Sequence, residues 1–591
     1  MNRYGDDWQA ASVNRGTGPF LNVIFRPGSF RVYLSILLLG LTFARCVTDT
    51  EMLRTSVDSR EQSEIRVSLV GRYVSGIYKQ GAAEIVAYEP VLQRAYVVNS
   101  AHSVVDVLDL SRPAEPKLLF SLNAADIGTN ANSVAVKNGI VAVAVAATEK
   151  SAPGFVVFFD KEGQRRAVVQ VGSLPDAVTF SPDGKFAMVA NEGEPNDDYS
   201  IDPEGTVSII DLSGGVENLA QQHVRTVDFK SFNGQESALR AKGVRIFGPN
   251  ASAAQDFEPE WIEVSADSKK AFVCLQENNA IAVIDVLSAK VETVWPLGFK
   301  DWSNDGRWSG SGFDSSDLDG GRHLRQWPIR GIFQPDTIRL VEANGEQYLL
   351  GANEGDGRAW GWTEEARVAE LKLDQTAFPD AGELQKPENL GRLIVTTTLG
   401  IANDVDASQP DVDVKATAVY NSLYTFGGRS LAIWRVRPDS LELVYDTGSQ
   451  MEETIAELTP HFFNSDGPTI DTGETRSPAK GPEPEGMAVG QIDGRTYAFV
   501  GLERVGGIMV YDVTTPSQTR FVQYINTRAK LVGAATESEL TNSDIAPEGL
   551  CFVPGSQSPD AQGRPLLLVG NEVSGTTSIY VIESVVVRSQ P

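Results

Sequence analysis

Short apolar runs separated by polar turn residues make up most of the chain between residues 67 and 587. The runs are rich in β-branched and aromatic residues and end at Gly, Asn, Asp or Pro, which is typical of short strands. Helical spacing of apolar residues is scarce, and its best example is ESALRAKGVRIFG at residues 236–248. The pattern therefore predicts an all-β protein with few helices.

Within this pattern one unit occurs five times. Each copy has a proline followed by Asp or Glu, then two apolar runs, and then a Glu after the second run. The steps from the first acid to the last are 16, 17, 18, 18 and 24 residues, and the fifth copy is lengthened by the insert GSQSPDAQGRP. Such a length suits a β-hairpin with a carboxylate at each end. The ten acids, in pairs, are Asp176 and Glu192, Glu260 and Glu277, Asp336 and Glu354, Glu485 and Glu503, and Glu548 and Glu572.

Repetition of this unit predicts a β-propeller. Two weaker copies cover residues 84–110 and 132–160, and a degenerate copy is expected around residues 422–446. We expect seven blades, with eight as the alternative, because the degenerate segment can be divided in two ways. Three long inserts, residues 213–258, 298–334 and 353–414, are expected over one face, where they can form a binding surface.

The N-terminal segment is predicted to direct export from the cell. Arg26 and Arg31 precede thirteen apolar-rich residues, 32–44, which are too few for a bilayer span but suit a signal-peptide core. We expect residues 1–44 to be a cleaved signal peptide or, as the alternative, an uncleaved signal anchor. Residues 45–66 are expected to be a polar linker, and residues 67–587 the propeller. The protein is therefore predicted to be extracellular, either secreted or held at the cell surface, with no membrane contact beyond this segment.

The net charge and the cysteine content narrow the class of protein and its possible partners further. The formal net charge of -27 argues against nucleic-acid partners, because phosphates would be repelled over most of the surface. Only three cysteines occur, so a disulfide framework does not hold the fold. Asn250 begins the single glycosylation sequon, Asn-Ala-Ser, which is used only if the protein passes through a eukaryotic secretory route.

The repeated acids are the main candidate for a functional site. An antiparallel hairpin brings its two ends to the same edge, so the propeller should gather these carboxylates on one face near its axis. Converging carboxylates repel each other unless their pKa values rise or a cation lies among them. Oxygen ligands without His or Cys favour Ca2+ or Mg2+. The alternative is structural, with Pro-Asp and the following Asn capping backbone groups at the blade edge.

A second candidate cation site is the loop that contains Asp314, Asp317 and Asp319. Alternating Asp residues closed by two glycines are similar to calcium loops, although the EF-hand spacing is absent. The alternative is a solvated acidic loop.

Support for covalent catalysis is thin, and whether the protein is an enzyme stays open. The sequence contains no GxSxG, P-loop or HExxH motif, and its four histidines are scattered.

The chain also resembles the choice-of-anchor I family. The matching segments include GSLPDAVTFSPDGKFAMVANEGEPNDDY, YTFGGRSLAIW, KGPEPEGMAVG and FVGLERVGGIMVYD, and together they extend over roughly residues 70–585. The family includes cell-surface glycoproteins and proteins labelled alkaline phosphatase. The resemblance implies an extracytoplasmic propeller that is attached to cells by differing means.

These observations lead to two hypotheses. The first is a secreted or cell-surface binding or adhesion protein with a cation-binding acidic face and an extracellular ligand, such as a matrix or cell-surface component. The alternative is a metal-dependent phosphoesterase, similar to alkaline phosphatases or phytases, in which clustered ions neutralise phosphate and activate water.

Overall fold

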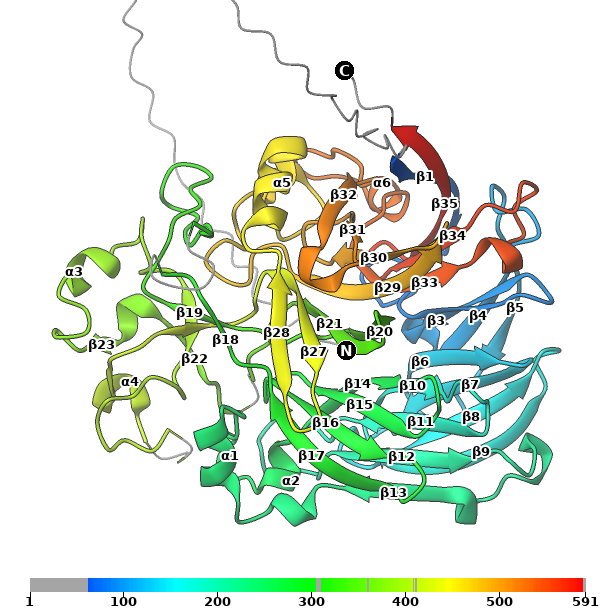
Figure 1. The fold of residues 1–591 in the computed structure, drawn as a ribbon, viewed down its shortest axis with the longest axis horizontal. Helices are drawn as coiled ribbons and strands as arrows, with labels where there is room; N and C mark the ends of the chain where they lie inside the picture. The colour runs from blue at the N-terminus through cyan, green and yellow to red at the C-terminus, as the bar shows by residue number, and fades with distance from the viewer. Residues whose placement is uncertain (1–61, 304–309, 359–360, 408, 410–411, 588–591) are drawn as a thin grey trace, which may run out of the picture. The chain divides into compact units, whose positions relative to one another are not determined.

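Seven four-stranded sheets dominate the part of the chain that the structure describes (Figure 1). This computed structural model describes residues 62–303, 310–358, 361–407, 409 and 412–587, and Ser63–Val586 form one compact unit. The prediction of an all-β propeller is confirmed by these sheets. The predicted export segment, residues 1–44, lies outside the described residues. No helix in the described ranges is long and apolar enough to span a bilayer.

Six of the seven sheets follow one another along the chain from inner to outer strand. The first three are β2 (Val86–Glu89), β3 (Arg94–Asn99), β4 (Val104–Asp109) and β5 (Lys117–Asn123); β6 (Asn130–Lys137), β7 (Ile140–Ala146), β8 (Pro153–Asp160) and β9 (Arg165–Ser173); and β10 (Pro175–Phe180), β11 (Phe186–Asn191), β12 (Thr206–Asp211) and β13 (Val224–Asp228). The next three are β14 (Pro259–Val264), β15 (Lys270–Leu275), β16 (Ala280–Asp285) and β17 (Lys290–Pro296); β20 (Ile338–Ala343), β21 (Glu346–Asn353), β27 (Ser430–Val436) and β28 (Leu441–Asp446); and β29 (Pro484–Ile492), β30 (Arg495–Leu502), β31 (Ile508–Asp512) and β32 (Arg520–Ile525).

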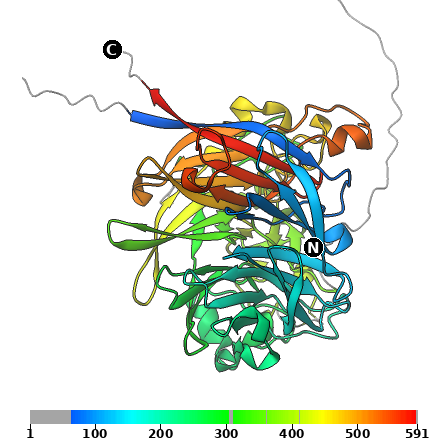
Figure 2. The same ribbon diagram turned by 90° about the vertical axis from the view of Figure 1, so that its right-hand side faces the viewer.

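The seventh sheet joins the two ends of the described chain. Its strands are β33 (Pro547–Val553), β34 (Leu566–Asn571), β35 (Thr576–Val587) and, beside β35, β1 (Gln62–Val74), as Figure 2 shows. The predicted end of the polar linker at residue 66 is therefore wrong, because residues 62–66 already belong to β1. Backbone pairing with β35 makes this polar segment a strand.

The seven sheets close into a ring. Each innermost strand contacts the innermost strand of the next sheet, in the order β2, β6, β10, β14, β20, β29 and β33, and β33 contacts β2. Seven apolar clusters fill the spaces between neighbouring sheets. Val98 and Val143 belong to the cluster between the first two sheets, and Leu568 and Val97 belong to the one that closes the ring. Burial between blades, rather than within one central core, therefore holds the propeller together.

Two of the inserts form a small subdomain with its own core. Its five-stranded sheet contains β18 (Phe299–Asp301), β19 (Arg330–Ile332), β26 (Tyr424–Thr425), β24 (Ile394–Thr396) and β22 (Glu365–Arg367), and β23 (Lys372–Leu373) pairs with β25 (Val419–Tyr420). The six α-helices in the described ranges are α1 (Glu236–Lys242), α2 (Ala253–Asp256), α3 (Ala381–Leu384), α4 (Val414–Thr417), α5 (Gln450–Leu458) and α6 (Glu537–Thr541). Figure 1 shows α3, α4, β22 and β23 grouped together, apart from the sheet β6–β9.

The expectation that residues 422–446 form a separate degenerate repeat is wrong. Strands β27 and β28 are instead the third and fourth strands of the sheet that begins with β20. Asn353 at the end of β21 is paired with Ser430 at the start of β27, although strands β22 to β26 of the subdomain lie between them in sequence. The helix predicted at residues 236–248 is shorter than expected, because α1 ends before Gly243, which has a φ of 99°.

Candidate functional site

The inner hairpins carry their acids at one edge, as the repeat predicts. In four of them the proline is paired with the last residue of the second strand, and a bulge follows it. The acid after the proline therefore lies in the bulge, and the acid of the second strand follows directly after the paired residue. The pairs are Pro175 with Asn191, Pro259 with Leu275, Pro484 with Leu502, and Pro547 with Asn571.

One predicted position is displaced. Leu275 is the residue paired with Pro259, so Gln276, and not Glu277, stands where the other repeats have their second acid. The Gln276 side chain donates a hydrogen bond to Glu354 at 3.0 Å, and Glu277 follows one residue further along the loop.

The first two sheets supply two side chains that the repeat pattern missed. The backbone N–H of Glu84 donates to Val98, as that of Asp336 donates to Ala352, both at 3.2 Å, so Glu84 and Asp336 occupy equivalent places. The signal in the sequence was a Glu directly before an apolar run, with Ala in place of the preceding Pro. In the second sheet the equivalent residue is Asn132, whose amide donates to the Pro175 carbonyl at 3.1 Å.

The asparagines that precede three of the acids have a structural role. Asn191 donates to the carbonyl and hydroxyl of Thr206 and to the Ser208 hydroxyl, at 3.1–3.2 Å. Asn571 makes the same three contacts with Thr576 and Ser578. The capping alternative therefore explains the role of the asparagines. It does not explain why a carboxylate follows each of them.

Side-chain oxygens of the acids approach closely in four groups of three, with all ligand atoms of a group within 4.8 Å of one another. We name each group after one member. They are the Asp336 triad (Asp336, Glu354, Glu485), the Glu192 triad (Glu192, Glu258, Glu277), the Glu84 triad (Glu84, Glu548, Glu572) and the Glu483 triad (Glu354, Glu483, Glu503). Glu258 and Glu483 each precede a proline and were missed because the repeat pattern starts at that proline.

Burial and mutual repulsion raise the pKa values of most of these carboxyl groups. For Asp336, burial is the largest cause, followed by the charges of Glu354 and Asp176, and the pKa rises to about 8. The pKa of Glu84 also rises to about 8, chiefly through burial and then the charge of Glu572. Glu260 is buried beside Glu277, Asp336, Glu192 and Asp176, and its pKa lies well above the ordinary range. The predicted acids therefore share one electrostatic environment, and their charges act on one another across blades.

Glycines directly after the acids let neighbouring inner strands approach. A Cβ on Gly486 would lie 1.6 Å from the backbone oxygen of Glu548, and one on Gly549 would lie 2.5 Å from that of Glu84. The sequence Pro-Glu-Gly therefore combines a carboxylate with the close approach that brings it to the carboxylate of the next blade.

Replacing Gly486 with Ala should force these two strands apart. We expect a loss of at least roughly 3 kcal/mol in the free energy of unfolding, because backbone and not a flexible side chain meets the new methyl group. Chemical denaturation would measure it. Gly214→Ala is the matched control, since a Cβ there meets nothing within 4 Å. Equal stability of the two variants would contradict the close approach.

The Glu483 triad has cations of its own. Glu483 is ion-paired with Arg476 at 2.5 Å, Lys480 at 3.4 Å and Arg504 at 3.5 Å. Lys480 also contacts Glu354 at 2.7 Å, and Arg504 contacts Glu503 at 3.0 Å. Burial alone would raise the pKa of Glu483, but Arg476, Lys480 and Arg504 outweigh it and lower the pKa to about 2.

An arginine from the loop after β21 borders the Glu192 triad. Arg358 is fully buried and is ion-paired with Asp256 at 2.7 Å and with Glu258 at 3.0 Å. Its guanidinium also lies 4.6 Å from the ring centroid of Phe247. The insert that carries Phe247 and Asp256 and the loop that carries Arg358 are thereby fixed against the edge where the acids lie.

The three acids of the second predicted cation site have separate partners in the structure. Asp314 accepts hydrogen bonds from the backbone of Ser316 and His323 at 3.2 and 3.3 Å, and Asp319 accepts one from Gly321. Asp317 is ion-paired with Arg392, with one contact at 2.8 Å. The three carboxylates are satisfied by separate partners, and within the described ranges they form no group of the kind found in the triads. Burial, and then the charge of Glu452, raises the pKa of Asp314 to about 7.

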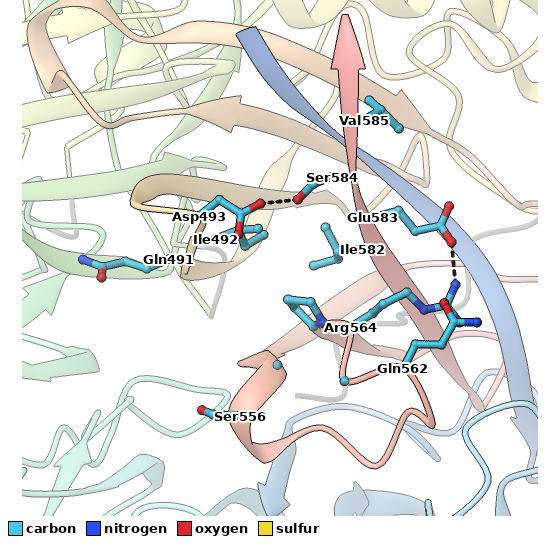
Figure 3. Close-up of a pocket in the computed structure, with 13 residues that line it drawn as sticks. Gln491, Ile492, Asp493, Ser556, Gln562, Arg564, Ile582, Glu583, Ser584 and Val585 are labelled. Carbon is cyan, nitrogen blue, oxygen red and sulfur yellow. Dashed lines mark hydrogen bonds and ion pairs between the residues drawn. The ribbon is translucent and has the colours of Figure 1, made fainter. Parts of the chain in front are cut away.

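Two further features lie away from the triads. Asn250 is exposed with a φ of 56° and lies three residues before the start of α2, so its side chain is accessible on the surface. A pocket of about 620 Å³ lies between the sheets that begin with β29 and β33 (Figure 3). Its lining includes Asp493, Ser584 and Arg564, and Arg564 is already ion-paired with Glu583 at 2.5 Å. None of the triad carboxylates lines this pocket.

Comparisons with known proteins agree with the resemblance noted in the sequence. The profile of the choice-of-anchor I domain matches residues 84–516. Over 205 residues the chain is 33% identical to Gigasin-3a of Magallana gigas, covering 33% of this chain and 66% of that protein. Over 335 residues it is 26% identical to the mesenchyme-specific cell surface glycoprotein of Strongylocentrotus purpuratus, covering 50% of this chain and 41% of that protein. The chain thus spans less than two thirds of either relative.

Solved structures with a similar course of the chain include hydrazine synthase from Kuenenia stuttgartiensis, with a TM-score of 0.42 and 14% identity. That match covers 86% of this chain and 98% of the other. The β-propeller domain of Cps50 (Swd1) from Myceliophteria thermophila has a TM-score of 0.40 and 9% identity, covering 86% and 99%. Identities this low imply no shared activity.

Proposed function

The chain belongs to the choice-of-anchor I domain family, and on that premise we propose that it is a secreted or cell-surface binding protein whose propeller holds divalent cations among its inner-strand acids. A relative that is named a cell surface glycoprotein supports the location. The clustered carboxylates support the cation.

The observation that carries the proposal is the Asp336 triad. Glu485 is 8% exposed, and one of its carboxylate oxygens has no hydrogen-bond partner among the described residues. Desolvation of that charge, together with the repulsion of Glu503 and Glu354, raises the pKa of Glu485 well above its ordinary range. A buried carboxylate without a partner is costly, and a hard cation shared with the neighbouring carboxylates relieves that cost.

The proposed partner is an extracellular component that carries anionic groups. A divalent cation held by carboxylates can complete its coordination with oxygen atoms from such a group. Without cations, a protein of net charge -27 repels the same partner. Matrix or cell-surface molecules with carboxylate or sulfate groups fit this requirement.

Calcium titration of the chelator-treated protein tests the proposal. We expect heat of binding in calorimetry and a rise in the thermal midpoint with Ca2+, without turnover of a chromogenic phosphoester. Asp267→Asn is the matched control, because Asp267 lies on an exposed hairpin turn and pairs with Lys269 at the surface. It should bind calcium as the unaltered protein does. Absence of both heat and stabilisation with Ca2+ and with Mg2+ would refute the proposal.

A metal-dependent phosphoesterase is the second candidate, and one observation favours it. The four triads of carboxylates lie in the same ring as Lys480 and Arg504, so bound ions and these basic side chains could together neutralise a phosphate. Chelator-sensitive turnover that is lost in Glu485→Gln and Glu548→Gln would establish this activity in place of simple binding.

A further inference from the structure

We infer that the inner ring takes two divalent cations, one in the Asp336 triad and one in the Glu192 triad, while Lys480 occupies the equivalent cation position in the Glu483 triad. This inference rests on the proposed function, because it assigns the number and place of the ions in the same site. It follows from a comparison of the four triads by charge, burial and unpartnered oxygens.

The Asp336 triad joins two neighbouring blades. Asp336 and Glu354 come from the β20–β21 hairpin, and Glu485 comes from the start of β29. Lys480 contacts one oxygen of Glu354 in this group, and the other oxygen of Glu354 accepts from Gln276. The hydroxyl of Thr337 donates to Asp336 at 3.2 Å, and one oxygen of Glu485 has no hydrogen-bond partner in the described part of the chain. The group therefore keeps an excess of negative charge with an oxygen free for a ligand.

The Glu192 triad has the same two properties. Glu258 is 1% exposed, and its Oε1 has no hydrogen-bond partner in the described ranges, while its Oε2 accepts from Arg358. Arg358 does not neutralise the triad, because the same guanidinium is ion-paired with Asp256. The triad thus gathers three carboxylates beside a guanidinium whose charge is shared with Asp256. An ion here would link the β10 and β14 blades.

The Glu483 triad needs no ion. Lys480 lies between Glu354 and Glu483 with its side chain only 16% exposed, and Arg476 and Arg504 supply two further positive charges. The ammonium group of Lys480 therefore takes the place among these carboxylates that a divalent cation takes in the Asp336 and Glu192 triads.

The Glu84 triad is also not expected to hold a divalent cation. Glu84 accepts a hydrogen bond from the Ser100 hydroxyl, and Glu548 and Glu572 are partly exposed to solvent. The positive charge of Arg504 acts on Glu572 and opposes the rise of its pKa. One oxygen of Glu548 also has no hydrogen-bond partner among the described residues, but Glu548 and Glu572 are open to water at their surface. The group therefore lacks an unpartnered carboxylate on a buried residue, which the other two triads have.

Elemental analysis of the full-length protein, after calcium loading and dialysis, tests the assignment. We expect two calcium ions per chain in the unaltered protein. The Glu485→Gln variant and the Glu192→Gln variant should each retain one. Glu503→Gln is the matched control, because Glu503 belongs to the triad that holds Lys480, and it should retain two. Lys480→Met removes the built-in cation without changing much volume, and it should raise the count to three.

The outcomes separate the inference from the proposed function. No bound divalent cation in the unaltered protein overturns both. A count of one, or of three or more, in the unaltered protein overturns only the inference, as does a lost ion in Glu503→Gln or an unchanged count in Lys480→Met. The count in the unaltered protein decides even if a variant fails to fold, and circular dichroism shows which variants have folded.

Discussion

Chelator-treated protein should lose thermal stability as the pH rises from 5 to 8.5. The pKa values of Asp336 and Glu503 rise to about 8 through burial first, with further increases from neighbouring carboxylates, although Arg504 opposes the rise at Glu503. In the unfolded chain these groups have ordinary pKa values near 4. The folded state therefore binds more protons between pH 4 and 8, so the stabilisation that these two groups contribute is complete below pH 4 and is lost as the pH rises through 8.

The expected fall in the thermal midpoint is roughly 5 °C or more. A pKa shift of one unit corresponds to about 1.4 kcal/mol. A folded body as large as this propeller loses about 1 °C in its thermal midpoint for each kcal/mol of stability. Calcium should reduce the fall, because cations replace the protons. Glu485→Gln should raise the midpoint of the chelator-treated protein at pH 8.5, because it removes one of the charges that repel Asp336. Scanning calorimetry over this pH range measures both effects. A midpoint that does not change with pH, or one that falls in the variant, would contradict this account.

The convergence of the acids was predictable because it depends on local geometry. A hairpin of fixed length returns to its starting edge, so equal spacing between acids in the sequence becomes one common edge in space. The offset position of Glu277 shows the limit of that argument. The pairing of Leu275 with Pro259 places Gln276 at the expected position, and a spacing of 17 rather than 16 residues does not reveal which residue of a turn faces the partner strand.

The charges that balance the acids could not be predicted. Lys480 and Arg358 come from loops that differ between blades, and nothing in the repeat specifies the paths of those loops. Glu483 is in the left-handed region with a φ of 51°, so the direction of its side chain depends on a backbone conformation that the sequence does not show. The pairing of Asn353 with Ser430 likewise depends on contacts across a whole subdomain. Repetition predicts the ring of acids, and tertiary contacts decide which of them are left without a counter-charge.

Replacing Arg358 with Met should destabilise the protein by about 3–5 kcal/mol, because it leaves the fully buried carboxylates of Asp256 and Glu258 without their cation. The expected fall in the thermal midpoint is about 3–5 °C for a unit of this size. Arg437→Met is the matched control. Arg437 pairs with Glu442 at 2.6 Å but is 38% exposed, so its loss should cost less than about 1 kcal/mol.

Calcium distinguishes this prediction from simple loss of packing. Glu258 belongs to both the ion pair with Arg358 and the Glu192 triad, so a cation bound in that triad can compensate for part of the missing charge. Saturating calcium should therefore recover some of the stability lost in Arg358→Met, beyond its effect on the unaltered protein, and should add nothing extra in Arg437→Met. Equal calcium effects in the two variants would mean that the arginine and the ion do not act on the same carboxylate. A larger effect in Arg358→Met would connect the buried ion pair of the insert to the cation chemistry of the ring.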